Sequence, residues 1–500
     1  MTLLNTRIQN NGIMKKASLL SLLVIFLIVT SCDDNKKSIK KAEVKTETVN
    51  KELFELLKPE QTGISFKNDF TLERDIEFYK FQYQFNGGGV GIADFNNDGK
   101  NDIYFTGNEV DNRLYLNKGD FKFEDISKTS GTEMSGEWSN GVCLVDINGD
   151  NFIDIYVSKG GMNTAENKKN VMLINNGDLT FTDRAEEMGI ADTGWTTQSI
   201  FIDFDNDDDL DLFVLNHPNS WSSTKRLDRD NYKNAPLGGD HFYENVNGTF
   251  KNITDKVGLK LEIFGGYGLG VAAGDLDQNG YIDLYISNDY SSPDFMYMNQ
   301  GDGTFKEEIK KRTNHIALYS MGNDIADFNN DGLLDILALD MSAEDHIRTK
   351  TQMSGMNPLF FNELVRFGLP HQYMYNSFQL NNGNGTFSEI AQIAGIQSTD
   401  WSWTPLFADF DNDGFKDLLV TNGYRLDDRD NDFTRRISKK YVKLDDLTDA
   451  EQIDRFTSTP STPLANYIFK NNGDYTFSKK TYEWGLHNKG FTQGSAFGDL

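Results

Sequence analysis

The sequence predicts an all-β fold: a β-propeller of seven four-stranded blades, the last of which is incomplete in this chain. Three observations lead to this fold class. A nine-residue acidic phrase recurs along the chain, strand-like segments flank every copy, and a hairpin pattern follows each copy. Repeats of about 50 residues that supply four strands each are typical of propeller blades. A parallel β-helix would need much shorter repeats, and a helical solenoid would need a 3.6-residue period.

The acidic phrase has the form D-x-D/N-x-D/N-x-x-x-D. Successive copies start 52, 57, 72, 52 and 82 residues apart. An apolar run such as GGGVGIAD precedes each copy, and a strand-like run such as DIYF or DLYI follows it. Each copy is therefore expected to be a loop between two strands. The six full copies are Asp94–Asp102, Asp146–Asp154, Asp203–Asp211, Asp275–Asp283, Asp327–Asp335 and Asp409–Asp417.

A second pattern, related to L-Y-x-N-x-G-x-x-x-F, supplies the other two strands of each repeat. It reads RLYLNKGDFKF in the first repeat and FMYMNQGDGTF in the fourth. An N-G or G-D pair between two short strand-like runs is a strong hairpin signal. Four strands per repeat follow.

Closure of the ring explains two further segments. A seventh acidic phrase begins at Asp499, and residues 62–68 resemble the last strand of each hairpin but have no acidic loop before them. A ring whose last blade is completed by the N-terminal strand has this arrangement. We therefore expect residues 60–500 to form a seven-bladed propeller that lacks most of blade seven, and the chain to be a fragment.

The N-terminal region has the pattern of a bacterial lipoprotein signal. Lys15 and Lys16 precede an apolar stretch of about fifteen residues, the length of a signal-peptide core, and VTSC ends it. Residues 1–32 are thus predicted to be a signal peptide, with Met14 a possible true start and Cys32 the lipidated residue. Residues 33–59 are charged and poor in apolar side chains, which predicts a flexible tether. The expected location is the cell envelope, as an outer-membrane lipoprotein, periplasmic or surface-exposed.

The charge balance restricts the partners. With 49 basic and 76 acidic residues the net charge is −27, which disfavours nucleic acid and favours bound cations. The two cysteines, Cys32 and Cys143, leave no disulfide framework.

The acidic phrase suits calcium, which takes six to eight oxygen ligands in a flexible cage. Side chains at positions 1, 3, 5 and 9 of an extended loop converge, and position 7 offers its backbone carbonyl. Position 6 must turn sharply; glycine occupies it in four copies, and Asn151 and Asp208 occupy it in the others. An EF-hand is excluded because position 12 is Phe105 in the first copy and the flanks are strands.

About six Ca²⁺ sites are therefore predicted, against the alternatives of Mg²⁺ or an acidic turn that binds nothing. The third copy, with Asp207, Asp208 and Asp209 in a row, is the least certain. The predicted ligands are Asp94, Asn96, Asp98, Lys100 and Asp102; Asp146, Asn148, Asp150, Phe152 and Asp154; Asp203, Asp205, Asp207, Asp209 and Asp211; Asp275, Asp277, Asn279, Tyr281 and Asp283; Asp327, Asn329, Asp331, Leu333 and Asp335; Asp409, Asp411, Asp413, Phe415 and Asp417.

Together these repeats resemble the FG-GAP/VCBS repeats of integrin α-chain propellers and of the cartilage-acidic-protein (ASPIC/UnbV-associated) group. Phrases such as YQFNGGGVGIADFNNDGKNDIYFTGN and DWSWTPLFADFDNDGFKDLLVTNG resemble large surface lipoproteins of Bacteroidota-type bacteria. The similarity covers roughly residues 60–500. It implies Ca²⁺ in the blade loops.

For function, the sequence favours a non-enzymatic binding or adhesion module for a protein or a glycan. Ligand contacts are expected on three insertions, residues 216–241, 341–373 and 423–456, the last of them partly helical. An envelope polysaccharide lyase or hydrolase on the same scaffold is the alternative, and a structural part of a transport assembly is a third possibility. Decoration that packs on the rim is the competing interpretation of the insertions. The candidate contacts are Trp221, Arg226, Arg348, Arg366 and Tyr373.

Overall fold

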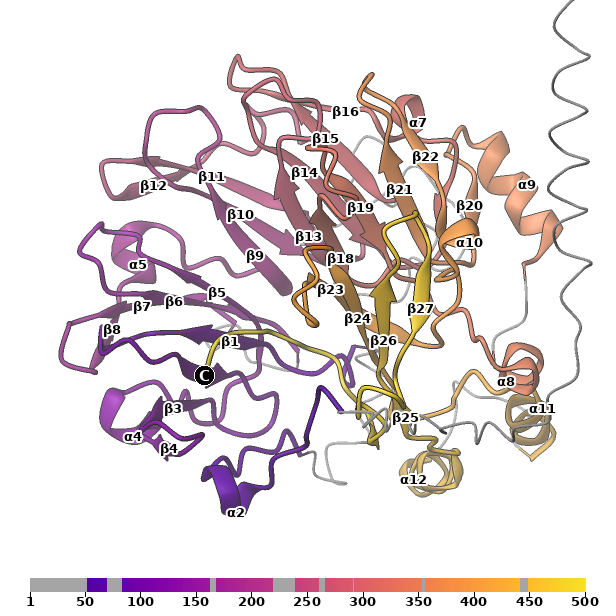
Figure 1. Cartoon of the computed structure of the whole chain (residues 1–500), viewed down its shortest axis with the longest axis horizontal. Coiled ribbons are helices and arrows are strands. Elements are labelled where there is room, and N and C mark those ends of the chain that lie inside the picture. Colours follow the sequence, from indigo (N-terminus) through magenta and orange to yellow (C-terminus); the bar gives the residue numbers. More distant parts are fainter. Residues whose placement is uncertain are drawn as a thin grey trace, which may run out of the picture. The chain divides into compact units, whose positions relative to one another are not determined.

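The computed structural model describes residues 52–69, 83–161, 168–218, 239–259, 266–290, 292–352, 356–440 and 448–500. Residues Lys51–Leu500 form one compact unit. Six antiparallel four-stranded sheets follow one another in chain order within it (Figure 1). The predicted all-β propeller is thus confirmed, with six complete blades. The predicted signal peptide and Cys32 lie outside the described residues.

In every blade the strands run in sequence order from the innermost to the outermost. Blade one is β1 (Val90–Ala93), β2 (Asp102–Phe105), β3 (Arg113–Asn117) and β4 (Phe123–Asp125). Blade two is β5 (Ser139–Val145), β6 (Asp154–Lys159), β7 (Val171–Asn175) and β8 (Phe181–Asp183). Blade three is β9 (Thr196–Ile202), β10 (Asp211–Asn216), β11 (His241–Val246) and β12 (Thr249–Asn252).

The other three blades keep this order around their insertions. Blade four is β13 (Gly268–Gly274), β14 (Asp283–Asn288), β15 (Phe295–Asn299) and β16 (Phe305–Glu307). Blade five is β18 (Asn323–Ala326), β19 (Asp335–Ala338), β21 (Ser377–Asn381) and β22 (Phe387–Glu389). Blade six is β23 (Ser402–Ala408), β24 (Asp417–Asn422), β26 (Tyr467–Asn471) and β27 (Phe477–Lys479).

The core lies between the blades, not inside any one of them. A separate cluster of buried side chains fills each of the five interfaces between consecutive blades. Between blades five and six, for example, Phe328 and Phe378 pack with Phe407 and Phe477. Because both faces of a sheet are covered, the second strands are buried along almost their whole length, which explains their near-continuous apolar runs.

Glycines in or next to the innermost strands let neighbouring blades approach closely. A Cβ on Gly322 of blade five would lie 2.2 Å from the carbonyl oxygen of Trp403 in blade six. A Cβ on Gly141 of blade two would lie 2.6 Å from the carbonyl oxygen of Thr197 in blade three. The glycines that precede the acidic phrases in the sequence therefore belong to the packing around the ring axis.

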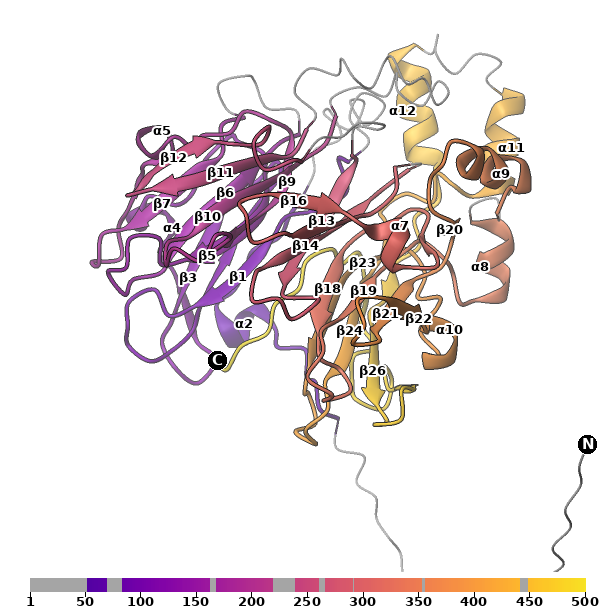
Figure 2. The same ribbon diagram turned by 90° about the horizontal axis from the view of Figure 1, so that it is seen from above.

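Helices are short or belong to insertions. One-turn helices follow the outermost strands as α4 (Ser127–Ser130), α5 (Ala185–Met188), α7 (Ile309–Arg312) and α10 (Ala391–Ala394). The longer helices α8 (His346–Thr351), α9 (Pro358–Arg366), α11 (Asn431–Lys440) and α12 (Asp449–Ser458) gather beside blades five and six (Figure 2). The prediction of helix within 423–456 is confirmed. Two small sheets pair β17 (Ile316–Ala317) with β20 (Gln372–Tyr373), and β25 (Leu464–Ala465) with β28 (Lys489–Gly490).

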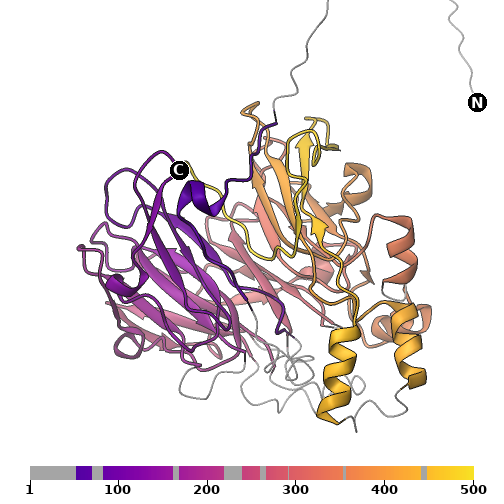
Figure 3. The ribbon, with the colours of Figure 1, turned by 90° about the horizontal axis from the view of Figure 1, so that it is seen from below.

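The C-terminal segment of the compact unit lies between blade six and blade one. The Thr404 hydroxyl of β23 donates to the Gln493 carbonyl at 2.7 Å, and the Asn101 amide beside β2 donates to the Asp499 carbonyl at 2.8 Å. The C-terminal segment thus bridges the two blades, and Figure 3 shows its end next to the first blade.

The prediction that residues 62–68 form an outer strand is wrong. Helix α2 (Pro59–Thr62) ends at Gly63 in a left-handed conformation, and residues 63–69 form no strand. Ile64 and Phe66 instead pack on blade one, where Phe66 stacks on Phe105 with ring centroids 4.9 Å apart. The compact unit also begins before the predicted boundary at residue 60, because Phe54 packs on Phe410 of blade six.

Candidate functional site

Each acidic phrase forms the loop between the innermost and the second strand of a blade, as predicted. Position 9 is always the first residue of the second strand and pairs with the last residue of the first, as Asp102 does with Ala93. Position 1 fastens the loop through both carboxylate oxygens. Asp94 accepts the backbone N–H of Asp98 at 3.1 Å and that of Gly99 at 2.7 Å. The position-1 aspartates of the other five copies accept the equivalent pair of N–H groups.

The turn at position 6 has a positive φ in all six copies. Glycine accounts for four of them, and Asn151 and Asp208 adopt 69° and 71°, so both substitutes turn as predicted. Position 4 also has a positive φ in every copy, from 57° at Asn97 to 70° at Gly149. This second left-handed residue was not predicted from the sequence.

The loops bring acidic oxygens together. Three groups of carboxylates each hold their oxygens within 4.8 Å of one another: Asp203, Asp205 and Asp207; Asp275, Asp277 and Asp283; Asp409, Asp411 and Asp413. One buried carboxylate oxygen of each of Asp205, Asp209, Asp277 and Asp411 has no hydrogen-bond partner among the described residues. A buried oxygen without a donor is costly unless a cation or water meets it, so this donor set fits a hard divalent cation.

The position-9 aspartates tie each loop to the hairpin of its own blade. One oxygen of Asp283 accepts the backbone N–H of Leu276 at 2.9 Å, and the other accepts that of Asn299 at 2.7 Å. Burial raises the pKa of all six position-9 carboxyls, to about 6 for Asp102 and about 7 for Asp283. A bound cation would oppose this shift.

Protein cations neutralise some of the loops. Lys470 contacts Asp411 and donates to Asp413 at 2.6 Å in the sixth copy. Lys100 pairs with Asp98 in the first copy, and Arg312 pairs with Asp277 in the fourth. The third copy has no described lysine or arginine within ion-pairing distance of its acids, although sequence analysis ranked it least certain.

Asparagines of the hairpin pattern join neighbouring blades, a role that sequence analysis missed. The Asn175 amide of blade two donates to the carbonyl of Phe95 in the blade-one loop at 2.8 Å. Asn299, Asn381 and Asn471 each make the same contact, at 2.8 Å, to the loop of the preceding blade. The recurring N in the hairpin pattern was the available signal.

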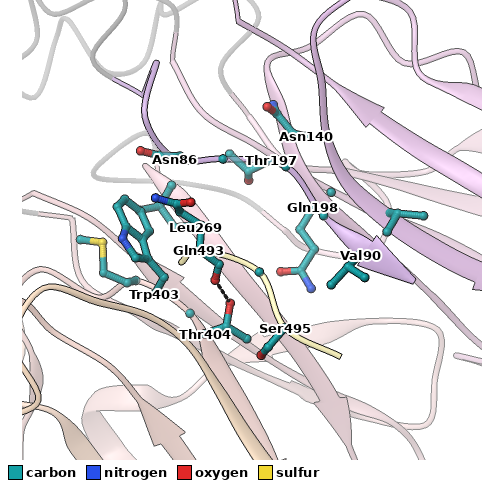
Figure 4. Close-up of a pocket in the computed structure, with 18 of the residues that line it drawn as sticks. Asn86, Val90, Asn140, Thr197, Gln198, Leu269, Trp403, Thr404, Gln493 and Ser495 are labelled. Atoms are coloured by element: carbon teal, nitrogen blue, oxygen red, sulfur yellow. Dashed lines mark hydrogen bonds between the residues drawn. The ribbon is translucent and has the colours of Figure 1, made fainter. Parts of the chain in front are cut away.

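A central cavity of about 230 Å³ lies on the ring axis. Its wall comes from the innermost strands or their flanks in all six blades and from residues 493–495 (Figure 4). Val90, Gln198 and Trp403 show how widely separated parts of the chain contribute. No sequence pattern predicted this cavity.

Three of the five candidate contacts on the insertions lie within the described residues. Trp221 and Arg226 lie outside the described residues. Arg348 makes a bidentate ion pair with Asp400, at 2.6 and 2.8 Å, so it fastens its insertion to the propeller. The Tyr373 ring packs against His315 and Phe361, with centroids 5.0 and 5.3 Å apart. Of the three described candidates, only Arg366 at the end of α9 is exposed.

A profile of the FG-GAP-like repeat matches residues 94–157, 275–338 and 364–420. The chain carries FG-GAP-like repeats. The first two segments each span two acidic loops, and the third contains the loop Asp409–Asp417. The resemblance to FG-GAP repeats that the sequence suggested is thereby confirmed.

Two curated relatives are cartilage acidic protein 1 of Xenopus tropicalis and of Homo sapiens. The first is 29% identical over 202 residues, which is 40% of this chain and 29% of the relative. The second is 28% identical over 226 residues, which is 45% of this chain and 31% of the relative. The chain therefore spans less than a third of the length of these relatives.

The solved structures that the chain matches are more distant in sequence. A lectin of Agrocybe aegerita, described for specific recognition of non-reducing terminal N-acetylglucosamine, shares 15% identity over 78% of either chain at a TM-score of 0.40. The V. cholerae biofilm matrix protein Bap1 shares 11% identity over 61% of this chain and 38% of its own, at 0.32. A Bacillus licheniformis rhamnogalacturonan lyase shares 9% identity over 67% and 69%, at 0.28.

Proposed function

We propose that the chain is a calcium-binding FG-GAP propeller that acts as a binding module for a protein or a glycan. The observation that carries the calcium assignment is the set of buried carboxylate oxygens without hydrogen-bond partners in the acidic loops. Positions 1, 3, 5 and 9 would supply carboxylate or amide oxygens, and position 7 its carbonyl. The ions would hold each loop against its hairpin. The hairpin asparagines, which donate to the loop of the preceding blade, would connect each ordered loop to the neighbouring blade.

A binding role is preferred to catalysis because of the central cavity. None of the described residues that line it carries an aspartate, glutamate, lysine or arginine side chain. A hydrolase needs a pair of carboxyl groups and a lyase needs a positioned base. Burial lowers the pKa of His217 in this cavity to about 4 and raises that of Tyr83 well above its usual value, so neither is ready to exchange protons at pH 7.

The calcium assignment is tested best at Asp205. Burial, and then repulsion from Asp207 and Asp203, raises the pKa of this carboxyl, which makes no described hydrogen bond through its buried oxygen. We expect Asp205→Ala to raise the melting temperature slightly in EDTA, because a repelled charge is removed. In millimolar Ca²⁺ the same variant should melt below wild type, because a ligand is lost.

Asp302→Ala is the matched control, because Asp302 is an exposed aspartate in a hairpin turn outside the loops. It should shift melting equally with and without calcium. Identical melting curves of wild type in EDTA and in Ca²⁺ would contradict calcium binding. Depolymerisation of a polysaccharide panel by the calcium-loaded chain would establish the enzymatic alternative instead.

We further propose that the ring has seven blade positions, with the seventh between blade six and blade one. Three contacts that recur between consecutive blades are repeated there by Phe54. The Phe54 carbonyl lies 2.3 Å from a Cβ built on Gly485, as the Phe250 carbonyl lies 2.7 Å from one on Gly189. The Phe54 N–H donates to the Trp484 carbonyl at 2.8 Å, as that of Phe305 does to Val257.

The third recurring contact is aromatic. Phe54 meets Phe410, which stands at position 2 of the blade-six loop, with centroids 5.5 Å apart. Phe181 meets Phe95, at position 2 of the blade-one loop, in the same edge-to-face manner at 6.0 Å. Phe54 therefore takes the outer-strand position of a seventh blade.

The proposed location is the outer membrane, through a lipid on Cys32. The support is the VTSC sequence after an apolar signal core. Among the described residues no helix is long and apolar enough to cross a bilayer. Mass spectrometry of the protein from a Gram-negative host should find a lipidated N-terminal Cys32, and Cys32→Ala should release the protein from the membrane fraction. An unmodified, membrane-free wild type would contradict the anchor.

A further inference from the structure

One position of the third strand carries a charge in only two of the six blades. It is the residue just before the hairpin asparagine: Lys470, before Asn471, in blade six, and Glu244, before Asn245, in blade three. Both asparagines donate their backbone N–H to the position-9 aspartate of their own loop, at 2.9 and 2.8 Å, so the two charged residues hold equivalent places. The other four blades have an apolar residue there: Leu116, Ile174, Met298 and Leu380.

The same two blades have the loops with the most acidic ligand sets. They alone place aspartate at both position 3 and position 5: Asp205 and Asp207 in blade three, and Asp411 and Asp413 in blade six. In each of the two loops the carboxylates of positions 1, 3 and 5 hold oxygens within 4.8 Å of one another. Like charges at this distance repel, so each loop needs a positive charge to balance them.

The other four loops relieve this repulsion without a charge on the third strand. In three of them position 3 is asparagine and its amide donates to the position-5 carboxylate, as Asn148 does to Asp150 at 2.9 Å. In the fourth copy position 5 is Asn279, which leaves only Asp277 of the pair, and Arg312 of α7 meets that acid at 3.0 Å. Blades three and six therefore form the matched pair, alike in their loops and opposite in the charge beside them.

Lys470 supplies the balancing charge in blade six. Its ammonium contacts Asp411 and donates to Asp413 at 2.6 Å, and so bridges two acids that are predicted to share a calcium ion. The contact is partly shielded from solvent, because the side chain of Lys470 is 29% exposed and that of Asp411 is 19% exposed. An ammonium that already pairs with both carboxylates reduces the gain from a second cation, so calcium and Lys470 compete for these oxygens.

Glu244 has the opposite effect in blade three. Its carboxylate pairs with the exposed Lys256 at 3.2 Å, and its charge contributes to raising the pKa of Asp205. Burial and the charges of Asp207 and Asp203 contribute more to that rise. The third loop therefore gathers negative charge that a bound cation would offset, and ligand charge is one of the factors that set calcium affinity.

We propose that Lys470 is a built-in cation of the blade-six loop, which keeps its form without calcium and binds calcium more weakly than the blade-three loop beside Glu244. This role rests on the proposed calcium binding, and it assigns an order of filling to two loops whose repeated sequence makes them look alike. As calcium falls, blade six loses its ion first and keeps its loop. Blade three holds its ion to lower concentrations and depends on it.

Lys470→Met tests the built-in cation. Methionine keeps the apolar stem of lysine and already stands at this place in blade four, as Met298. In EDTA the variant should melt about 1–3 °C below wild type, because Asp411 and Asp413 are left to repel each other. In saturating Ca²⁺ this deficit should disappear. Calorimetric titration of the full chain with Ca²⁺ should show one site that binds at least about tenfold more tightly than in wild type.

Glu244→Lys is the reciprocal test. It places an ammonium at the equivalent position of blade three, beside Asp205 and Asp207. The variant should melt above wild type in EDTA, because the repelled carboxylates gain a partner. In the calorimetric titration one tight site should weaken at least about tenfold. Because this variant is expected to be the more stable one without calcium, it decides the question even if Lys470→Met does not fold.

The matched controls change ion pairs that involve no acid of the loops. Lys479 of β27 lies in the same blade as Lys470 and pairs with Glu344 at 2.5 Å. Glu124 of β4 pairs with Lys118 at 3.2 Å. Lys479→Met and Glu124→Lys should each shift the melting temperature by the same amount in EDTA and in Ca²⁺, and should leave every calcium affinity unchanged.

The outcomes separate this inference from the proposed function. If wild type takes up no calcium in the titration, both are overturned. If wild type binds calcium but Lys470→Met and Glu244→Lys leave every affinity unchanged, Lys470 is an ordinary ion pair, and calcium binding stands without the built-in cation. A deficit of Lys470→Met that is equal in EDTA and in Ca²⁺ would overturn the inference in the same way. Opposite changes of affinity in the two variants support it.

Discussion

At the scale of single residues, one hydrogen-bonding position recurs in all six blades although no sequence pattern marked it. The residue just before the third strand is asparagine in four blades and aspartate in two, and its side chain accepts a backbone N–H from a residue at or just after the end of the second strand. In blade one Asn112 accepts from Gly107 at 2.8 Å, and in blade four Asp294 accepts from Asn288 at 3.0 Å. The other four are Asn170, Asp240, Asn376 and Asn466.

Asp294 makes this position sensitive to pH. Burial raises its pKa to about 7, so the folded state binds the proton more tightly than the unfolded state does. The stability that the proton provides is present below about pH 4 and is lost as pH rises through about 7. Ionisation then leaves a buried charge beside Tyr285 and Ser320, which donate to the same oxygen.

We expect Asp294→Asn to remove this dependence. Asparagine has the required shape, since Asn112 fills the same place in blade one and donates to the hydroxyl of Tyr104 at 2.9 Å. The free energy of unfolding of the variant, relative to wild type, should rise by at least about 1.4 kcal/mol between pH 5 and pH 8, the value of one pKa unit. Urea unfolding at both pH values measures it. A constant difference would show that Asp294 does not titrate in this range.

At the scale of elements, the acidic loops are linked into a row. The residue at position 4 donates its side-chain amide to the position-6 carbonyl of the next blade: Asn97 to Asn151 at 3.0 Å, and Asn330 to Gly414 at 2.9 Å. Asn206 and Gln278 make the same bond. Blade two has Gly149 at position 4, so its loop has no side chain to reach blade three.

Replacement of this glycine should supply the missing link. Gly149 has a φ of 70° and open space around its Cα, and asparagine adopts 57° to 62° at four equivalent positions. We expect Gly149→Asn to raise the free energy of unfolding by about 0.5–1.5 kcal/mol through a bond to the Asp208 carbonyl. Gly149→Ala is the control, because it adds a side chain at the same φ without a donor. If alanine stabilised as much as asparagine, the gain would not come from the bond.

The acidic loops, the hairpins and the blade order could all be predicted, because each is encoded in one short stretch that repeats along the chain. The contact made by position 4 could not, because Asn and Gly there suit a turn equally well and only the neighbouring blade provides the partner. The contact made by the residue before the third strand could not either, because Asn or Asp there suits a turn and its partner is a backbone N–H near the end of the second strand of the same blade. The central cavity could not be predicted from the sequence for a similar reason. Gln198, Trp403 and Ser495 stand far apart in the sequence and share no pattern, and only the ring brings them together.

The outer strand near the N-terminus was misplaced for a different reason. Nine residues separate Phe54 from Gly63, whereas eight separate Phe123 from Gly131 and each corresponding pair. With no acidic loop before Phe54 to set the register, the sequence around residues 62–68 gave the better apparent match. The contacts of Phe54 with its neighbours decide the alignment.

At the scale of the whole molecule, stability should depend on the junction between blade six and blade one. A ring resists opening only if every interface holds, and the core consists of interfaces. At this junction Phe54 packs on Phe410 as Phe181 packs on Phe95 between blades one and two. We therefore expect Phe54→Ala to destabilise the whole propeller, not merely to loosen the N-terminus.

The expected loss is about 1–3 kcal/mol, somewhat below a full core Phe→Ala because Phe54 is only half-buried. It should appear as one cooperative transition at lower temperature in calorimetry. Leu56→Ala is the control, since Leu56 is 66% exposed two residues away. Phe181→Ala should act in the same direction and more strongly. If Phe54→Ala shifted melting no more than Leu56→Ala does, Phe54 would be a peripheral contact, and the ring would have six blade positions bridged by a segment instead of seven.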